Sequence, residues 1–306
     1  MANFVLVHGA WHGAWCWRHV TDALIRAGHR AHAVTLTGLG ERAHLMSPAI
    51  TLETHIADVI GVIEAEELTD VVLAVHSYGG MLGTAVADRL TQRLSHLVYV
   101  DAVVPKPGES WSSTHARATR EARLAAAAAD PNHSFPPPDP SVFGLRGADH
   151  DWVKRRQTPH PGHTYQAPLV FDPQRVAQVP RTFINCTQPP LATIDVIRTR
   201  VTDPKFWDGA WLPGSRVVEL ATGKATKVSA HEGQAQFNAQ DFSPDGQWLY
   251  YTANDQGEFA QLRRVKLGSW EHEPVRSADW DIVAAYFSKG GKYLAVITQS
   301  EVKVKN

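Results

Sequence analysis

The amino-acid sequence predicts an α/β fold built on a mostly parallel, doubly wound sheet, followed by a smaller region rich in β-strands. Over residues 1–104, short apolar runs alternate with helical patterns, and such alternation is typical of strands joined by helices in a parallel sheet. Two more apolar runs follow residue 180. From about residue 224, turn-rich stretches with alternating apolar residues replace the helical patterns, which indicates a second region.

The strands of the first region are expected where apolar runs are bounded by turn residues, at 3–9, 30–36, 70–76, 96–102, 181–186 and 215–220. Helices are expected at 17–29, 51–64 and 79–90. The second helix has one apolar face, formed by Leu52, Ile56, Val59, Ile60 and Ile63. Ligands of such sheets bind beyond the carboxyl ends of the strands, so we expect the functional residues there.

Residues 105–180 interrupt this alternation and predict a helical cap inserted between two strands. An alanine-rich helical stretch at 122–130 leads into the proline-rich loop 131–141. The stretch 151–169 is polar and aromatic and carries few strand signals. We expect the cap to cover the functional edge of the sheet.

The composition limits the classes of function. The chain has 306 residues, a formal net charge of −1 and 43% hydrophobic residues, which gives no electrostatic reason to expect a nucleic acid or membrane partner. Two cysteines, Cys16 and Cys186, cannot form a disulfide framework. The sequence shows no signal-peptide pattern and no apolar run near the ~18 residues that span a bilayer. The expectation is a cytoplasmic protein.

A serine with the surroundings of a nucleophile lies between an expected strand and an expected helix, in VHSYGG (75–80). A sharp turn here lifts the Ser77 hydroxyl above the sheet, and the N-terminus of the next helix stabilises negative charge beside it. The elbow pattern G-x-S-x-G usually begins with glycine, whereas this chain has Val75. We expect this valine to strain the approach of strand and helix.

A second glycine turn, HGAWHGAWCW (8–17), follows the first expected strand. Its backbone N–H groups can face an oxyanion, and the amides of Ala10 and Tyr78 are the natural pair for this role. Trp11 is expected to shape the substrate pocket together with aromatic residues of the cap. The sequence has no cysteine–histidine spacing of a zinc site and no phosphate-binding glycine loop, so no cofactor is expected.

Residues 1–223 resemble the α/β-hydrolase superfamily, in particular the branch of plant methylesterases, hydroxynitrile lyases and related bacterial esterases. The resemblance rests on HGAWHGAWCW, on HSYGG (76–80), on YVDAVVP (99–105) and on the cap sequence around WVKRRQTP (152–159). It implies a serine nucleophile, an acid, a histidine after the last strand, and no cofactor.

The base of the triad is displaced from the position that the resemblance implies. Lys224 follows ATG (221–223), where related hydrolases carry the histidine. A protonated lysine cannot accept the serine proton. The nearest downstream histidine is His231, and a loop of eight residues can span up to about 26 Å. We therefore expect His231 to serve as the base.

The acid is displaced as well. The resemblance places it just after 181–186, but TQPPLAT (187–193) offers no carboxylate. Asp195 follows soon after, while Asp101 lies at the carboxyl end of the preceding strand, a position that some α/β-hydrolases use. We prefer Asp101 because of this place at a strand end, with Asp195 as the alternative.

Residues 224–306 contain two self-similar stretches, FSPDGQWLYYTAND (242–255) and FSKGGKYLAVITQS (287–300), whose starts lie 45 residues apart. This period suits blades of a β-propeller. The segment resembles a fragment of the propeller of TolB-like proteins and prolyl-oligopeptidase-type peptidases. It supplies only about one and a half blades, where propellers need about four to eight. We interpret the chain as a fusion. The open strand edges of this segment must pack on the hydrolase, pair with another chain or stay partly disordered, and a homodimer through the segment is one of these outcomes.

The sequence therefore predicts a carboxylesterase-type serine hydrolase that acts on small, apolar ester molecules. A hydroxynitrile lyase that cleaves cyanohydrins is the first alternative, although lyases of this branch carry threonine where this chain has Gly9. The second alternative is a fusion protein without turnover that binds ligands or self-associates. Lys224 is its chief support.

Overall fold

The protein divides into two compact units, Met1–Lys224 and Ala225–Asn306, which are described separately. The structure, a computed structural model, describes residues 1–186, 191–202, 216–220, 237–254, 259–266, 271–279, 281–288 and 291–299. Among these residues, no helix has the length and apolar character needed to cross a membrane.

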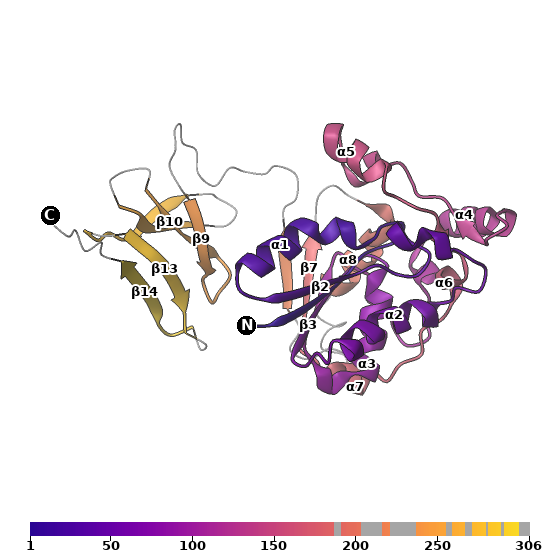
Figure 1. The fold of residues 1–306 in the computed structure, drawn as a ribbon, viewed down its shortest axis with the longest axis horizontal. Coiled ribbons are helices and arrows are strands. Elements are labelled where there is room, and N and C mark those ends of the chain that lie inside the picture. The colour runs from indigo at the N-terminus through magenta and orange to yellow at the C-terminus, as the bar shows by residue number, and fades with distance from the viewer. Residues whose placement is uncertain are drawn as a thin grey trace. The chain divides into compact units, whose positions relative to one another are not determined.

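The N-terminal unit is built on a six-stranded sheet in the order β2-β1-β3-β4-β7-β8 (Figure 1). Its strands are β1 (Asn3–Val7), β2 (Arg30–Val34), β3 (Val71–His76), β4 (Leu94–Val100), β7 (Arg181–Cys186) and β8 (Arg216–Leu220). Every neighbouring pair is parallel, which confirms the predicted sheet. The chain leaves β1 toward one edge and returns to β3 on the other side, so the strand order reverses at β1, where such sheets bind ligands.

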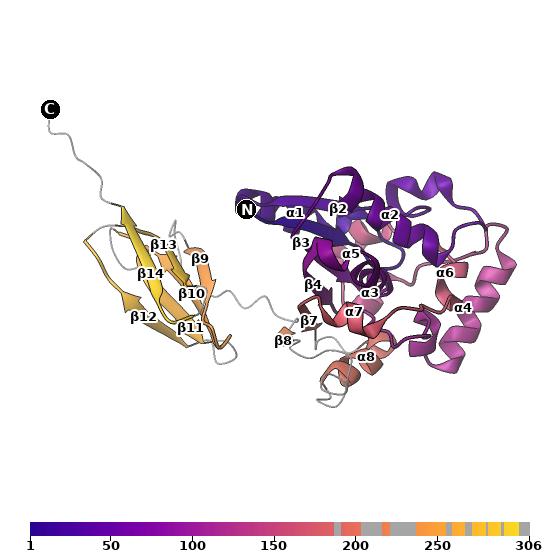
Figure 2. The same cartoon turned by 90° about the horizontal axis from the view of Figure 1, so that it is seen from below.

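Helices connect these strands. They are η1 (Ala14–Trp17), α1 (Arg18–Arg26), η2 (Gly40–Leu45), α2 (Leu52–Ala65), α3 (Gly79–Arg89) and η3 (Thr91–Arg93). The side chain of Thr51 caps α2 by accepting a hydrogen bond from the Thr54 amide. The apolar face of α2 is buried as expected, except that Ile60 is half-buried, and it also contains His55. Figure 2 shows α3 beside β3 and β4, where nearly all of its residues are buried.

The valine in the elbow pattern has a compensating glycine on the next helix. Val75 is completely buried at the end of β3. A Cβ atom built on Gly83 of α3 would lie 2.8 Å from Cγ1 of Val75, closer than two carbon atoms can pack. In the usual elbow pattern, a glycine on the strand leaves room for the helix. Here the strand carries valine, and the glycine on the helix leaves that room instead. The expected strain is relieved because Gly83 has no side chain.

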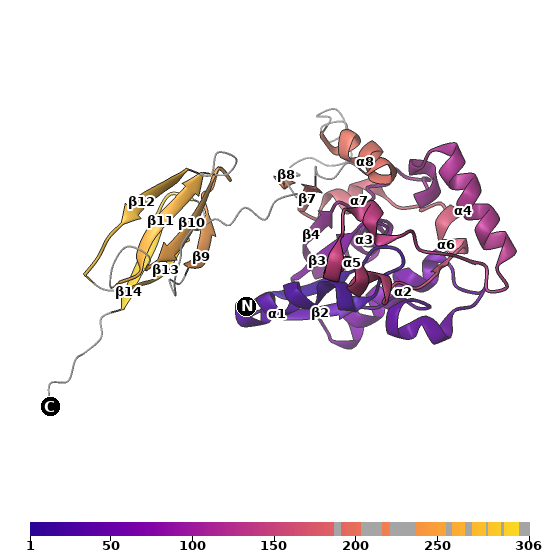
Figure 3. The same cartoon turned by 90° about the horizontal axis from the view of Figure 1, so that it is seen from above.

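The cap follows β4 and consists of short elements. They are η4 (Trp111–Thr114), α4 (Arg117–Ala129), β5 (Ser134–Phe135), η5 (Pro140–Phe143), α5 (Gly147–Lys154), β6 (His160–Pro161), α6 (His163–Gln166) and α7 (Pro173–Ala177). Figures 1 and 3 show α4 and α6 side by side. The predicted alanine-rich helix is real but begins earlier, at Arg117. Helix α8 (Ala192–Thr202), between β7 and β8, was not predicted.

The C-terminal unit contains two antiparallel sheets. One has the order β12-β11-β10-β9, formed by β9 (Phe237–Phe242), β10 (Trp248–Ala253), β11 (Gln261–Lys266) and β12 (His272–Arg276). The other is the hairpin of β13 (Asp281–Phe287) and β14 (Leu294–Gln299). The sequence repeat reappears in the backbone, because Gly246 and Gly291 both have φ of 67° and both donate to the carbonyl of the serine three residues earlier.

Candidate active site

Ser77 lies in a sharp turn between β3 and α3. Its φ angle is 52°, in the left-handed region that non-glycine residues rarely adopt. Three backbone hydrogen bonds hold the turn: the Ser77 amide donates to Val100, and the Ser77 carbonyl accepts from Gly80 and Val103 at 3.0 and 2.9 Å. This is the geometry expected of a nucleophile elbow.

Glycines allow three segments to meet at Ser77. A Cβ on Gly80 would lie 1.9 Å from the carbonyl oxygen of Val103, and one on Gly79 would lie 3.0 Å from that of His8. On the other side, a Cβ on Gly9 would lie 2.8 Å from Cβ of Ser77. The turn after β1 therefore packs directly against the serine, and no side chain at position 9 fits without a shift.

Three of the six non-glycine residues with positive φ among the described residues lie at this edge of the sheet. Trp11, Ser77 and Asp101 have φ angles of 64°, 52° and 45°, and they follow the neighbouring strands β1, β3 and β4. Each such residue costs on the order of 1–3 kcal/mol, and such strain occurs mainly at functional sites. Glu67, Asp70 and His133 share this conformation elsewhere, but only at the carboxyl edge do three such residues follow neighbouring strands, which supports this edge as the candidate site.

The two amides expected to hold an oxyanion belong to the segments that meet here. Ala10 follows Gly9 and is buried, and Tyr78 follows Ser77 at the N-terminus of α3. Within the described part of the chain, no hydrogen bond uses the backbone N–H of Ala10 or Tyr78. Both donors are therefore available in the described structure.

Trp11 lies under the cap rather than in an open turn. It is only 5% exposed, and its ring packs edge-on against Trp111 and Phe135, with centroids 6.0 and 5.8 Å apart. The Thr158 amide donates to the Trp11 carbonyl at 3.0 Å. The guanidinium of Arg123 lies 5.1 Å from the centre of the Trp11 ring. The cap and the turn after β1 thus form one aromatic cluster.

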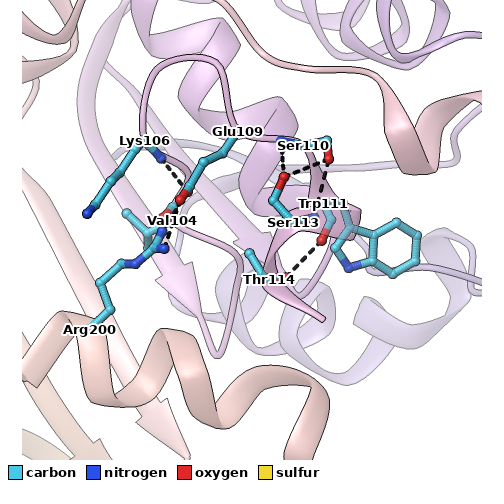
Figure 4. A network of polar contacts seen from close by, with 8 residues as sticks. All are labelled: Val104, Lys106, Glu109, Ser110, Trp111, Ser113, Thr114 and Arg200. Carbon is cyan, nitrogen blue, oxygen red and sulfur yellow. Dashed lines mark hydrogen bonds and ion pairs between the residues drawn. The ribbon is translucent and has the colours of Figure 1, made fainter. Parts of the chain in front are cut away.

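Polar contacts fix the cap residue Trp111 in this cluster (Figure 4). Ser110 and Ser113 form a capping box at the start of η4. Just before it, the carboxylate of Glu109 accepts two hydrogen bonds from Arg200 of α8, at 2.7 and 2.9 Å. Arg200 also donates to the carbonyl of Val104 at 3.1 Å. Helix α8 thereby holds the segment that leads from β4 into the cap.

Histidines near Ser77 are engaged in the fold. His8 donates through Nδ1 to the Gly9 carbonyl at 2.7 Å and accepts the Leu36 amide at Nε2. Burial lowers the pKa of His8 to about 3. Burial also lowers the pKa of His76 to about 4. A general base works best with a pKa near the operating pH, so neither ring is suited to that role.

The two candidate acids meet on one arginine. Both carboxylate oxygens of Asp101 accept from Arg198 of α8, at 2.8 and 2.7 Å, and Nη1 of Arg198 donates to Asp195 at 2.9 Å. The side chains of Asp101 and Arg198 are each 11% exposed. Asp101 thus lies next to the elbow, but its described partner is a cation rather than a histidine.

Sequence reasoning missed Arg198, because the helix that carries it was not recognised. It also missed His55, although a signal was present: His55 falls at helical spacing between Leu52 and Val59 on the buried face of α2. Lys224 and His231 lie outside the described residues. The described part of the chain contains no group of three or more His, Cys, Asp or Glu arranged to hold a metal ion.

The fold and this edge define an α/β hydrolase. A family model described as "Alpha/beta hydrolase family" matches residues 4–266, and the chain belongs to this family. Within it, the chain falls in the esterase branch. Carbendazim hydrolyzing esterase from Nocardioides sp. (strain SG-4G) is 49% identical over 179 residues, which are 56% of this chain and 74% of that protein. Methylesterase 9 of Arabidopsis thaliana is 37% identical over 106 residues, 34% of this chain and 41% of that protein.

Solved structures show the same fold. An extracellular α/β-hydrolase from a Paenibacillus species superposes with a TM-score of 0.59 at 21% identity, covering 72% of this chain and 89% of that chain. The methylesterase MES16 from Arabidopsis gives 0.56 at 23% identity, with coverages of 72% and 89%. The two relatives matched by sequence are named as esterases and do not favour the hydroxynitrile lyase alternative.

Proposed function

We propose that the protein is a carboxylesterase that cleaves small, apolar esters with Ser77 as nucleophile. The observation that carries this proposal is the strained turn at Ser77, with the Gly9 turn packed against it. The Ser77 oxygen attacks the ester carbonyl carbon, and the amides of Ala10 and Tyr78 stabilise the resulting oxyanion. A base takes the serine proton and delivers it to the departing alcohol, after which water releases the acid.

In this proposal His231 is the base and Asp101 orients it, with Asp195 as the alternative acid. The short distance from Ser77 to the backbone after β4 supports Asp101. Trp11 and the aromatic cluster under the cap give the pocket its apolar character. The name of the Nocardioides relative gives carbendazim as its substrate, so carbendazim is one compound to test beside simple aryl esters.

The decisive experiment combines a fluorophosphonate probe with p-nitrophenyl acetate turnover. Wild-type protein should be labelled at Ser77, and Ser77→Ala should lose labelling and about 10⁴- to 10⁶-fold in kcat while remaining folded. Turnover of Ser77→Ala within tenfold of wild type would place the nucleophile elsewhere.

His231→Ala tests the base. Turnover should fall by a factor comparable to that of Ser77→Ala, and the double variant should lose little more, because the two groups act as a unit. His272→Ala is the matched control, because it also removes a histidine from the C-terminal unit. The His272 ring hydrogen-bonds the Tyr251 hydroxyl of that unit at 2.7 Å, so its loss should leave turnover unchanged. Full activity of His231→Ala would contradict this assignment.

The second candidate function is ligand binding without turnover, which Lys224 favours because it occupies the expected histidine position. A wild-type protein that binds an aryl ester, turns none over and is not labelled by the probe would support this candidate.

A further inference from the structure

One cap histidine touches both segments that meet at Ser77. His160 of β6 is completely buried. The centre of its ring lies 4.8 Å from that of Tyr78, which follows the nucleophile, and 6.2 Å from that of Trp11, which follows Ala10. Both contacts are edge-to-face, the arrangement that aromatic rings prefer.

Hydrogen bonds connect the same two segments through His160. The Trp11 amide donates to Nδ1 of His160 at 3.5 Å, so Nε2 of the neutral ring carries the proton and donates to Oγ1 of Thr164 at 3.0 Å. The Thr164 hydroxyl in turn donates to the Pro161 carbonyl at 2.7 Å. Through the Nδ1 contact on one side and the ring contact on the other, His160 links the Trp11 amide to the Tyr78 ring.

The ring must stay neutral for this arrangement. Burial lowers the pKa of His160 well below its usual value, and the neighbouring His55, His8 and Arg123 lower it further. A protonated ring would have two donors and could not accept the Trp11 amide. Tyr78 is also held by His55 of α2, whose Nδ1 accepts the tyrosine hydroxyl at 3.0 Å.

We propose that His160 is a positioning residue that fixes the turn after β1 relative to the elbow, and through them the oxyanion-binding amides of Ala10 and Tyr78. This inference rests on the proposed esterase function. Oxyanion donors work only within about 2.7–3.1 Å of the developing charge, and a misplacement of about 1 Å can cost about 10²-fold in rate. His160 therefore acts on the transition state more than on substrate binding.

The test uses His160→Phe, which keeps a ring but removes both nitrogens, and Thr164→Val, which removes the acceptor with little change in volume. We expect kcat to fall about 10- to 100-fold in the first variant and less in the second, with KM within about twofold of wild type. Binding of an alkyl trifluoromethyl ketone, which forms an oxyanion on Ser77, should weaken by a similar factor. Binding of the matching methyl ketone should not change.

His163→Phe and two conservative variants complete the design. His163 is an exposed cap histidine stacked on His133, and its replacement should leave all parameters unchanged. Thr164→Ser keeps the hydroxyl and should retain wild-type kcat, and His160→Gln should recover part of the loss. A rise in KM at constant kcat, or equal losses for both ketones, would overturn the proposal, because His160 would then only shape the pocket.

A separate measurement distinguishes failure of this proposal from failure of the esterase function. If wild-type protein neither turns over esters nor reacts with the probe, the esterase function fails. Hydrogen exchange of the Trp11 amide still tests His160: exchange should be faster in His160→Phe and unchanged in His163→Phe. Equal protection in wild type and His160→Phe would overturn the positioning role.

Discussion

The Asp101 carboxylate depends on Arg198 for charge compensation. Both groups are nearly buried and joined by two hydrogen bonds. Removing one partner of such a pair leaves an uncompensated charge, which typically costs about 3–5 kcal/mol. Arg198→Met should therefore lower the free energy of unfolding by about 3 kcal/mol, measured by urea denaturation. Arg198→Met/Asp101→Asn should recover most of that loss, because the only described carboxylate that still lacks Arg198 is then Asp195, whose side chain is 46% exposed.

The same double variant reports on the acid. If Asp101 orients the base, the double variant should be stable but slow, with kcat reduced by about 10⁴-fold. Arg117→Met is the control, because the Arg117–Glu121 pair is exposed and such pairs contribute little. A stable double variant with wild-type kcat would shift the role to Asp195.

The sequence predicted which residues lie at the site better than it predicted which side chains they contact. Ser77 and the Gly9 turn each belong to a short sequence motif that directly follows a strand, and such local motifs are visible in the sequence. The ion pair of Asp101 joins residues 97 positions apart. No local pattern specifies which cation reaches a buried carboxylate, so Arg198 could only be found in the folded chain.

At the scale of elements, β3 and α3 pack closely because Gly83 faces Val75. Gly83→Ala would place a methyl group 2.8 Å from the valine side chain. Overpacking of a buried contact typically costs about 1–3 kcal/mol, so the free energy of unfolding should fall by that amount despite alanine's higher helix propensity. In a Val75→Ala background the same substitution should cost clearly less, because Cδ1 of Leu97, at 3.1 Å, is then the nearest atom that still crowds the added methyl group. Thermal or urea unfolding of the four proteins gives the coupling directly.

Gly61→Ala is the matched control for this cycle. Gly61 lies on the exposed side of α2, with no atom within 4 Å of an added Cβ, so alanine should stabilise the protein by up to about 1 kcal/mol. Equal destabilisation by Gly83→Ala with and without Val75 would show that the two side chains do not compete for space.

Element boundaries show why periodicity succeeds in some regions and fails in others. Helix α2 has a capping box and a regular apolar face, and its predicted range is within a residue of the observed one. Helix α8 interrupts its apolar residues with Arg198 and Arg200, which form ion pairs with Asp101 and Glu109 outside the helix. When charged residues take positions on the inward side of a helix, the regular spacing of apolar residues that identifies a helix in the sequence is lost.

At the scale of the whole molecule, we propose that the protein self-associates through its C-terminal unit. The sheet β12-β11-β10-β9 ends in two strands paired on one side only among the described residues, and such edges recruit further strands. The β13–β14 hairpin also exposes apolar side chains, Val283, Tyr286, Tyr293 and Ile297. Exposed apolar residues gathered on one hairpin are typical of an interaction surface.

Light scattering after size-exclusion chromatography should therefore give a dimer whose population falls on dilution. Tyr286→Lys/Ile297→Lys should produce a monomer with unchanged kcat, because both substituted side chains are exposed and neither belongs to the proposed catalytic residues. Val170→Lys, a change at an 80% exposed valine of the N-terminal unit, should leave the dimer intact. A wild-type protein that is monomeric at all concentrations would contradict the proposed homodimer. A dimer that survives the double substitution but not Val170→Lys would place the interface on the N-terminal unit instead.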